Sequence, residues 1–445
     1  MIGLVIAVSS FAALFRDLGL SAAAVQKGSL THQQMTNLFW LNVMMGAVLM
    51  VLMAASSPLV AVFFDNSDLR NLTLLLSVKF LLNSLGTQHG ALMQRNLEFG
   101  KRAFATIGGS VVTLIISVLL AFKGLSYWSL AWGSLAGSLT TTVLLFFLSS
   151  FRPGRWTGLE SLKPLLRFGM NVTAFDFINY FHRNTDTFLI GKFYGEESLG
   201  LYNRAYQLLM LPIVRIRGPI NSVAFPVLSR LQDKPDAFRR FFRKIIYLLA
   251  VTSMPLVALL FLVSHDLIYV TLGKAWLEAA PIFSFLSLTA FIQPVASLRG
   301  MVLMATGQSK RYLNWGIVNA VLVTIGFLIG ISWGAVGVAI SYAVVNYLLL
   351  FPSVIYVFEK TPLELSDFFK PIAFPVTSSL ITIIICHVSF GFFDGMNEWE
   401  VWLRLLISIC SFCGVWLLIM LCFTKSRQEF LSIPLLLRSL KPKKS

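Results

Sequence analysis

Apolar segments long enough to cross a membrane recur along almost the whole chain. A hydrocarbon core about 30 Å thick is crossed by roughly 20 residues of α-helix, which satisfies its own backbone hydrogen bonds in lipid. Short charged or Gly/Pro-containing breaks separate these segments. The sequence therefore predicts an all-α polytopic membrane protein with about twelve complete spans. They are expected at residues 38–64, 69–93, 104–122, 127–148, 164–190, 202–228, 241–263, 279–305, 312–331, 335–357, 371–393 and 401–423.

The composition supports lipid as the solvent of most side chains. Hydrophobic residues make up 56% of the 445 residues and charged residues only 13%, a balance that is not typical of soluble domains. A net charge of +16 on a soluble protein would suggest a nucleic-acid partner. In a membrane protein, basic loops on one side explain the same charge. We therefore expect the lipid bilayer as a partner, and no nucleic acid.

Residues 1–15 form an apolar segment that is short for a span. The segment lacks both the basic n-region and the cleavage site of a signal peptide. We expect it to be part of a helix whose beginning lies upstream. With it, about 13 spans are visible, and about 14 are expected in a complete chain.

Lysine and arginine are concentrated in every second loop. Because two successive spans return the chain to the same side, these loops share one face, which the positive-inside rule assigns to the cytoplasm. The opposite loops are short and poor in both residues. The residues on the expected cytoplasmic face are Arg95, Lys101, Arg102, Arg152, Arg155, Lys163, Arg230, Lys234, Arg239, Arg240, Arg243, Lys244, Lys310, Arg311, Lys360, Lys370, Lys425, Arg427, Arg438, Lys441, Lys443 and Lys444.

The longest basic break in the first half divides the chain into two lobes. Many transporters have such repeated halves, with the substrate bound between them near the membrane midplane. The expected order is an N-terminal lobe lacking its first helix at 1–150, a cytoplasmic inter-lobe loop at 151–163 and a C-terminal six-helix lobe at 164–358. Two additional helices at 359–424 and a basic cytoplasmic tail at 425–445 follow.

Charged side chains within the spans are unevenly distributed. An ionisable group at the centre of a bilayer costs on the order of 3 kcal/mol or more, so such residues mark cavities or pathways by default. The span at 164–190 carries polar residues three or four positions apart, which place them on one helical face. They are Asp176, Asn179, Tyr180, Arg183, Asp186 and Thr187.

Cations predominate at membrane depth. The next span contains Arg204, Arg215 and Arg217 together with Pro212 and Pro219, which can kink a helix and free backbone groups. Arg204 and Arg215 are eleven residues, or three turns, apart and point the same way. The remaining buried cations and polar residues are Lys79, Asn83, His89, Gln293 and Arg299.

Each of these residues has two interpretations. Arg183 could pair with Asp176 or Asp186 between helices, and residues near a helix end, such as Arg204 or His89, could reach the aqueous interface. Taken as a set, the excess of arginines over acids favours an anionic guest. A pyrophosphate is the simplest anion to propose, because the planar guanidinium binds phosphate oxygens with two parallel hydrogen bonds.

The chain lacks the common catalytic and cofactor motifs. No P-loop, HExxH, GxSxG or dinucleotide fingerprint occurs, so we expect no catalytic residue and no cofactor. Cys410 and Cys413 form a CxxC within an apolar segment that offers no further metal ligands, so no metal is expected. Gly133 and Gly137 form a GxxxG pair, which favours close helix packing.

Several segments in combination resemble a known family. They are FRDLGLSAAAVQ at 15–26, RNTDTFLIGKFYGEESLGLYNRAYQLLMLP at 183–212, FPVLSRLQ at 225–232, LGKAWLEAAPI at 272–282 and MATG at 304–307. Over essentially its whole length the chain resembles the polysaccharide transporters of the multidrug/oligosaccharidyl-lipid/polysaccharide (MOP) exporter superfamily. The similarity is greatest to the colanic acid and exopolysaccharide flippase branch.

The resemblance implies a function. Two six-helix lobes are expected to surround a cationic cavity and to carry undecaprenyl-pyrophosphate-linked oligosaccharide from the cytoplasmic to the periplasmic face by ion-coupled alternating access. It implies a role in exopolysaccharide or lipopolysaccharide biosynthesis, beside a polysaccharide polymerase and chain-length machinery. Asp176 and Asp186 are the acids expected to couple an ion. The expected substrate-binding residues are Arg183, Arg204, Arg215, Arg217, Arg299 and Lys79.

Two alternatives share some of these features. A membrane-embedded polysaccharide polymerase or ligase would handle the same substrate, but such an enzyme usually needs a long external loop, and the external loops here are short. A multidrug antiporter of the same superfamily would favour an acid-rich cavity for cationic drugs. The excess of arginines within the spans argues against the antiporter.

Overall fold

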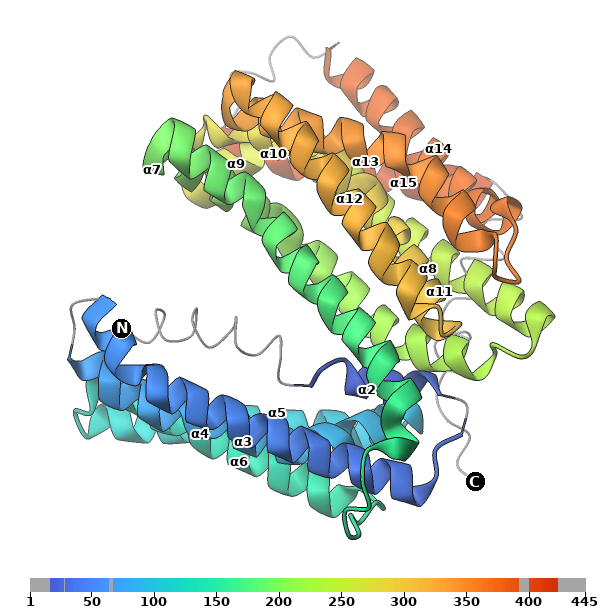
Figure 1. Ribbon diagram of the computed structural model, residues 1–445. Helices are drawn as coiled ribbons and strands as arrows, with labels where there is room; N and C mark the ends of the chain where they lie inside the picture. Colours follow the sequence, from blue (N-terminus) through green and yellow to red (C-terminus); the bar gives the residue numbers. More distant parts are fainter. Residues whose placement is uncertain (1–16, 28, 64–66, 392–399, 423–445) are drawn as a thin grey trace. The chain divides into compact units, whose positions relative to one another are not determined.

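The computed structural model describes residues 17–27, 29–63, 67–391 and 400–422; the side chains at 63, 180–183, 196 and 390–391 fall outside the description. Every regular element in these ranges is an α-helix or a short 3-10 helix (Figure 1). The first helices are α2 (Leu20–Gln26), α3 (His32–Phe63), α4 (Asp68–Arg95), α5 (Phe99–Phe122), α6 (Ser126–Leu148), η1 (Glu160–Leu162) and α7 (Lys163–Arg230). They are followed by α8 (Pro235–Leu262), α9 (Ser264–Leu272), η2 (Lys274–Trp276), α10 (Ala279–Ala296), α11 (Leu298–Ala305), α12 (Ser309–Gly330), η3 (Ile331–Trp333), α13 (Gly334–Phe358), α14 (Leu365–Gly391) and α15 (Val401–Cys422).

In the part of the chain that the structure describes, each of the expected complete spans coincides with helical structure. Within the described residues, 9 helical segments are long and apolar enough to cross a membrane, and one of these, 309–358, is divided into α12 and α13. Helix α4 and the first part of α7 are long but more polar. The structure thus confirms an all-α polytopic membrane protein. The segment at 1–15 lies outside the described residues.

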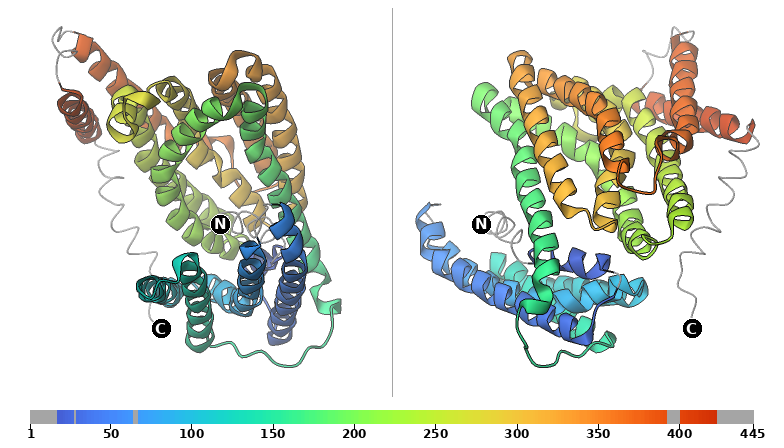
Figure 2. Two further views of the ribbon diagram at one scale, coloured as in Figure 1. Left: turned by 90° about the vertical axis from the view of Figure 1, so that its left-hand side faces the viewer. Right: turned by 45° about the vertical axis from the view of Figure 1, so that its right-hand side comes forward.

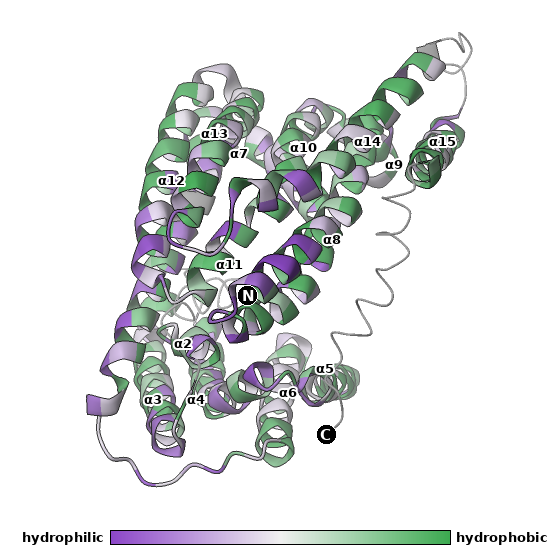
Figure 3. Ribbon diagram, turned by 90° about the vertical axis from the view of Figure 1, so that its right-hand side faces the viewer, coloured by the Kyte–Doolittle hydropathy of each residue, from purple (hydrophilic) through white to green (hydrophobic). Residues whose placement is uncertain are grey.

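The hydropathy of the helices shows the solvent of each part. Most helical surfaces are apolar, and hydrophilic residues gather near several helix ends, notably at the beginning of α8 (Figure 3). Many large apolar side chains on α3, α5, α12 and α15 lie on the outer surface of the protein. Val62, for example, is 80% exposed and Phe122 is 87% exposed. Such surfaces are stable only in lipid, because contiguous apolar area is unfavourable in water.

The chain forms two compact units. The first comprises residues 1–177 and 307–313, and the second comprises residues 178–306 and 314–445. The chain passes from one unit to the other within α7, between α11 and α12, and within α12. The division of the sequence into lobes at 1–150 and 164–358 remains a prediction.

In the first unit, helices α3 to α6 lie side by side (Figures 1 and 2). α3 packs on α4, α5 packs on α6, and α4 also contacts α6. Small residues bring α5 and α6 close together: a Cβ atom on Gly133 would lie 2.0 Å from Ser117 Oγ, and one on Gly137 would lie 1.8 Å from Thr113 Oγ1. The close packing predicted for this glycine pair is confirmed.

In the second unit, α8 packs against both α10 and α14, and α10 packs against α13. Phe283 on α10 and Val338 on α13 are fully buried in one apolar cluster, to which Val257 of α8 also belongs. This cluster includes Tyr202 of α7. The last two helices, α14 and α15, contact one another and pack on α8 and α9.

Within the second unit, ion pairs attach α14 to α8 and α15 to α9. Asp367 of α14 is fully buried and accepts hydrogen bonds from Arg239, at 2.9 Å, and from Arg243, both on α8. Asp266 of α9 accepts two hydrogen bonds from the guanidinium of Arg404 on α15, one of them 2.7 Å long. Both terminal helices are therefore fixed by charge-assisted contacts in addition to apolar packing.

Candidate functional site

Helix α7 carries most of the residues expected to form the site, and it is two helices in one element. Gly195 interrupts it with φ 78° and ψ −173°, a conformation that an L side chain rarely adopts. The preceding part runs from 163 to 194 and the following part from 196 to 230. Three prolines, Pro212, Pro219 and Pro226, lie within the second part.

Asp186 lies in the interior of the second unit, just before this break. Asp186 is only 6% exposed. The Tyr202 hydroxyl donates to Asp186 Oδ2 at 2.7 Å, and the backbone N–H of Thr187 donates to Oδ1 at 2.7 Å. Tyr202 follows the break, so the bond to Asp186 connects the two parts of α7. A buried carboxyl group that is hydrogen-bonded in this way is a candidate for protonation or ion coupling.

Asp176 belongs to the first unit and is exposed. The residue before it, Phe175, stacks on Tyr312 with ring centroids 3.8 Å apart, and Asn171 donates to Ser309 Oγ at 3.1 Å. These contacts join the first part of α7 to the beginning of α12 within that unit. The two acids expected to couple an ion therefore belong to different units.

Two of the expected arginines share an exposed helical face. Arg204 and Arg215 are both exposed and, at 100° per residue, differ by only about 20° in direction. Arg204 donates to Gln207 Oε1 at 3.3 Å, one turn further along the same face. Arg217 lies two residues beyond Arg215, on roughly the opposite face, and is half-buried. Arg204 and Arg215 thus form the arginine face, the term used below for these two side chains.

Arg299 has a different environment. It lies at the start of α11, immediately after the end of α10, and is half-buried. Its Nε donates to the carbonyl of Ala296 at 2.8 Å, and its Nη1 donates to the carbonyl of Leu350 on α13 at 3.5 Å. The guanidinium therefore satisfies carbonyl groups where one helix ends, a stabilising role that positive side chains often have at helix C-termini.

The remaining expected cations add no further member to the arginine face. Lys79 is half-buried on α4 in the first unit. The side chain of Arg183 lies outside the described residues. Among the described residues, no group of three or more histidine, cysteine or acidic side chains could hold a metal ion.

The interior of the first unit contains polar groups that sequence reasoning missed. Asn42 of α3 and Gln88 of α4 are fully buried, and their side chains have no hydrogen-bond partner among the described residues. His89 does not reach the aqueous interface, which its place near the end of a span would allow; it is fully buried between the rings of Phe39 and Phe146. In the sequence, the unusual polarity of the 69–93 span indicates buried polar groups. It does not show which side chains contact one another.

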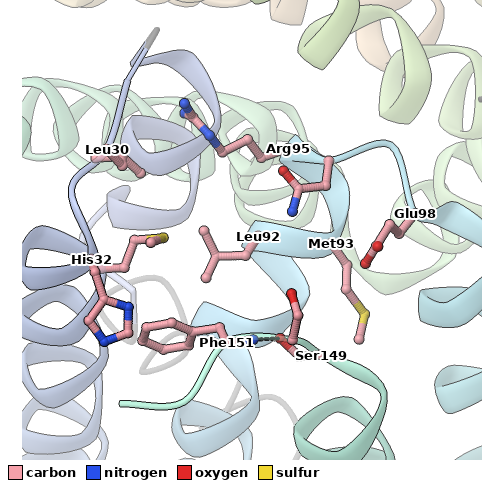
Figure 4. A pocket seen from close by; sticks show the side chains of 11 residues that line it. Leu30, His32, Leu92, Met93, Arg95, Glu98, Ser149 and Phe151 are labelled. Atoms are coloured by element: carbon pink, nitrogen blue, oxygen red, sulfur yellow. Dashed lines mark hydrogen bonds between the residues drawn. The ribbon is translucent and has the colours of Figure 1, made fainter. Parts of the chain in front are cut away.

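A pocket of about 330 Å³ lies at one end of the first unit, between the beginning of α3, the end of α4 and the segment after α6 (Figure 4). His32 and Phe151 lie together on one wall, with ring centroids 5.7 Å apart. Arg95 and Glu98 contribute opposite charges. The Arg95 guanidinium donates to the carbonyls of Ala24, at 2.7 Å, and Lys27. Arg95 therefore stabilises the end of α2, and the pocket has no excess of positive charge for an anion.

Comparison with known proteins places the chain in a family. Residues 1–281 match the sequence profile of the family described as "Polysaccharide biosynthesis protein". The teichuronic acid biosynthesis protein TuaB of Bacillus subtilis (strain 168) is 29% identical over 92% of this chain and 86% of its own length. The lipopolysaccharide biosynthesis protein WzxC of Escherichia coli (strain K12) is 28% identical over 74% of this chain and 68% of its own length.

Solved structures share the fold. A lipid II flippase MurJ in an inward closed conformation has a TM-score of 0.64 and 15% sequence identity, covering 97% of this chain and 92% of that protein. An outward-facing multidrug resistance MATE family transporter of the MOP superfamily has a TM-score of 0.64 and 14% identity, covering 80% of this chain and 86% of that protein. The sequence match and the shared fold agree with the resemblance drawn from the motifs: the chain is a multi-pass membrane protein that belongs to the polysaccharide biosynthesis protein family and has the MOP exporter fold.

Proposed function

We propose that this protein is a flippase that moves undecaprenyl-pyrophosphate-linked oligosaccharide units from the cytoplasmic to the periplasmic face of the bacterial inner membrane. The units would serve exopolysaccharide or lipopolysaccharide synthesis, alongside a polymerase and chain-length machinery. Relatives named for polysaccharide biosynthesis and, in Rhizobium meliloti (strain 1021), the succinoglycan biosynthesis transport protein ExoT support a transport role. A lipid II flippase with the same fold supports a lipid-linked substrate.

The observation that carries the proposal is the arginine face of α7. Arg204 and Arg215 are exposed on the same side of the helix 197–230, which has 34 residues and is apolar enough to cross a membrane. Two exposed guanidinium groups at membrane depth are unstable against lipid, so this side requires water or an anion. Phosphate oxygens are the matching partners, because guanidinium binds them with two parallel hydrogen bonds.

The mechanism follows from the chemistry of the substrate. The pyrophosphate and sugars would bind at the arginine face while the prenyl chain stays in lipid, so that only the polar head group crosses. Rocking of the two expected lobes would then open the site to the other side. Asp186 is the better of the two candidate coupling acids, since it is buried and hydrogen-bonded to Tyr202. Its protonation would change the charge inside the second unit.

The test is replacement of Arg204 and Arg215 by alanine, singly and together, in cells that depend on this protein for surface polysaccharide. The export of polysaccharide is measured at matched protein level. Arg240→Ala is the control, because Arg240 is exposed on α8, outside the arginine face. We expect a loss of export of tenfold or more in the double variant and no change in the control. Unchanged export in the double variant would exclude the arginine face as the substrate site.

A further inference from the structure

The second part of α7 has a regular pattern of prolines. Pro212, Pro219 and Pro226 are seven residues apart, which corresponds to two helical turns. A proline has no backbone N–H, so the carbonyl four residues earlier loses its partner in the helix. Two of the carbonyls concerned are those of Leu208 and Arg215, and the seven-residue spacing places the three prolines along one side of the helix.

Only one of these three positions is open. Pro226 is buried and Pro212 is half-buried, whereas Pro219 is exposed. Next to it, Gly218 is exposed, and a Cβ atom built there would have no heavy atom within 4 Å. Arg215, whose carbonyl Pro219 leaves without its helical donor, is exposed as well. One turn of helix thus combines a guanidinium, a carbonyl acceptor and a bare patch of backbone.

These three groups have complementary chemistry. The Arg215 guanidinium donates hydrogen bonds and suits a phosphate, whereas the Arg215 carbonyl accepts them and suits a hydroxyl group. A carbonyl without a donor is costly at membrane depth unless water or a ligand supplies one. The missing side chain at Gly218 lets a ligand approach the backbone closely. A sugar attached directly to a phosphate presents a hydroxyl group and phosphate oxygens close to one another. It therefore matches the carbonyl and the guanidinium of Arg215.

We propose that residues 215–219 form a glycosyl-phosphate subsite, in which the Arg215 side chain binds the phosphate and the Arg215 carbonyl accepts a hydrogen bond from a hydroxyl of the first sugar. The inference rests on the proposed function, since it assigns the first sugar to the same face. It predicts that recognition at this subsite depends on the sugar nearest the pyrophosphate and on few features of the sugars beyond it.

The experiment compares two probes on the full-length protein in lipid nanodiscs: undecaprenyl pyrophosphate and the same lipid carrying one glucose. The ratio of the two dissociation constants gives the contribution of the sugar. Pro219→Ala restores a backbone N–H that can donate a hydrogen bond to the Arg215 carbonyl. Gly218→Leu covers the bare backbone at a position where an added Cβ atom has no heavy atom within 4 Å. In both variants we expect the sugar contribution to fall about 2- to 10-fold, the range of one neutral hydrogen bond, with the affinity for undecaprenyl pyrophosphate retained.

Two controls make the outcomes distinct. Pro226→Ala replaces another proline of the same helix, at a buried position, and should leave the sugar contribution unchanged. Arg215→Ala should weaken both probes; if it weakens neither, the proposed function of the arginine face fails. If Arg215→Ala weakens both but Pro219→Ala and Gly218→Leu keep the full sugar contribution, the subsite is wrong and the proposed function stands.

Discussion

The Tyr202 hydroxyl donates a 2.7 Å hydrogen bond to Asp186 Oδ2 across the interruption of α7 at Gly195. Both residues are buried, Tyr202 at 1% and Asp186 at 6% exposure. A hydrogen bond in an interior of low polarity is strong, and a buried acceptor without its donor is costly. The contact therefore determines how the second part of α7 continues from the first.

Removal of this hydroxyl should lower the stability of the protein. We expect Tyr202→Phe to cost about 1–3 kcal/mol, because Asp186 would lose a donor that no water easily replaces. A lower melting temperature of the purified protein in detergent would show it. Tyr206→Phe is the control, since Tyr206 lies on the same helix, with its ring centroid 6.4 Å from that of Tyr202. In the background of Asp186→Asn, Tyr202→Phe should cost less; an equal cost in both backgrounds would contradict the coupling.

The ion pairs of Asp367 should be essential for the attachment of α14. Asp367 is fully buried and is bonded to both Arg239 and Arg243. Loss of one partner of a buried ion pair costs about 3–5 kcal/mol. The cost here should be near the lower end of that range, because the side chains of Arg239 and Arg243 are 27% and 48% exposed and Arg239 keeps its ion pair with Glu364. We expect Asp367→Asn to reduce the yield of folded protein strongly and to lower its melting temperature.

Glu364 provides the matched control for Asp367. It also pairs with Arg239, at 2.8 Å, but its side chain is 62% exposed. An exposed ion pair contributes at most about 1 kcal/mol, so Glu364→Gln should have little effect on the melting temperature. Similar effects of the two substitutions on the melting temperature would show that the attachment of α14 does not depend on the buried carboxylate of Asp367.

Close packing of α5 on α6 gives a third prediction. A Cβ atom on Gly133 would lie 2.0 Å from Ser117 Oγ and 2.8 Å from the backbone carbonyl of Thr113. The backbone cannot move without separating the helices, so Gly133→Ala should destabilise the protein by about 1–3 kcal/mol. Gly100→Ala on α5 is the control, because no heavy atom lies within 4 Å of its Cβ position. A melting temperature that falls equally in both variants would rule out this packing.

The spans were predictable because lipid imposes its requirement, a run of apolar residues, on each helix separately. Each run of about 20 apolar residues needs no knowledge of its neighbours to be recognised as a span. The packing role of Gly133 was predictable for a similar reason, since a GxxxG pair on one helix already defines a close-contact face. Even the polarity of the 164–190 span indicated that one face of this helix does not contact lipid.

The partners of the charged residues were not predictable, because they depend on contacts between distant segments. The sequence places Arg239 and Arg243 in a basic loop that indicates orientation, yet both bind Asp367, more than 120 positions away. Arg299 was assigned to the substrate cavity, and its described partners are the carbonyls of Ala296 and Leu350. Its role at the substrate remains a prediction, and the nearby Pro294 is a local sign of an interrupted helix.

The two residues of the arginine face should form two separate binding positions for the substrate, which are called stations below. Arg204 and Arg215 are eleven residues apart, so their Cα atoms are separated by about 16 Å along the helix axis. The exposed side chains of Leu211 and Val214, at 63% and 50%, lie between them. A pyrophosphate group is only a few ångströms across. Without strain, therefore, only one of the two arginines binds the phosphates at a time. On the topology expected from the basic loops, Arg215 lies nearer the cytoplasm and would bind first.

Independent stations have a quantitative consequence. Losses from residues that do not share a partner multiply, whereas losses within one binding contact do not. We expect the fold reduction in export of the Arg204→Ala, Arg215→Ala double variant to equal the product of the single reductions. Arg204→Lys and Arg215→Lys, which keep the charge but lose the paired donors, should each lose less than alanine. If the double variant is no worse than the more severe single variant, the two arginines bind the same phosphate group, and transfer between stations is excluded.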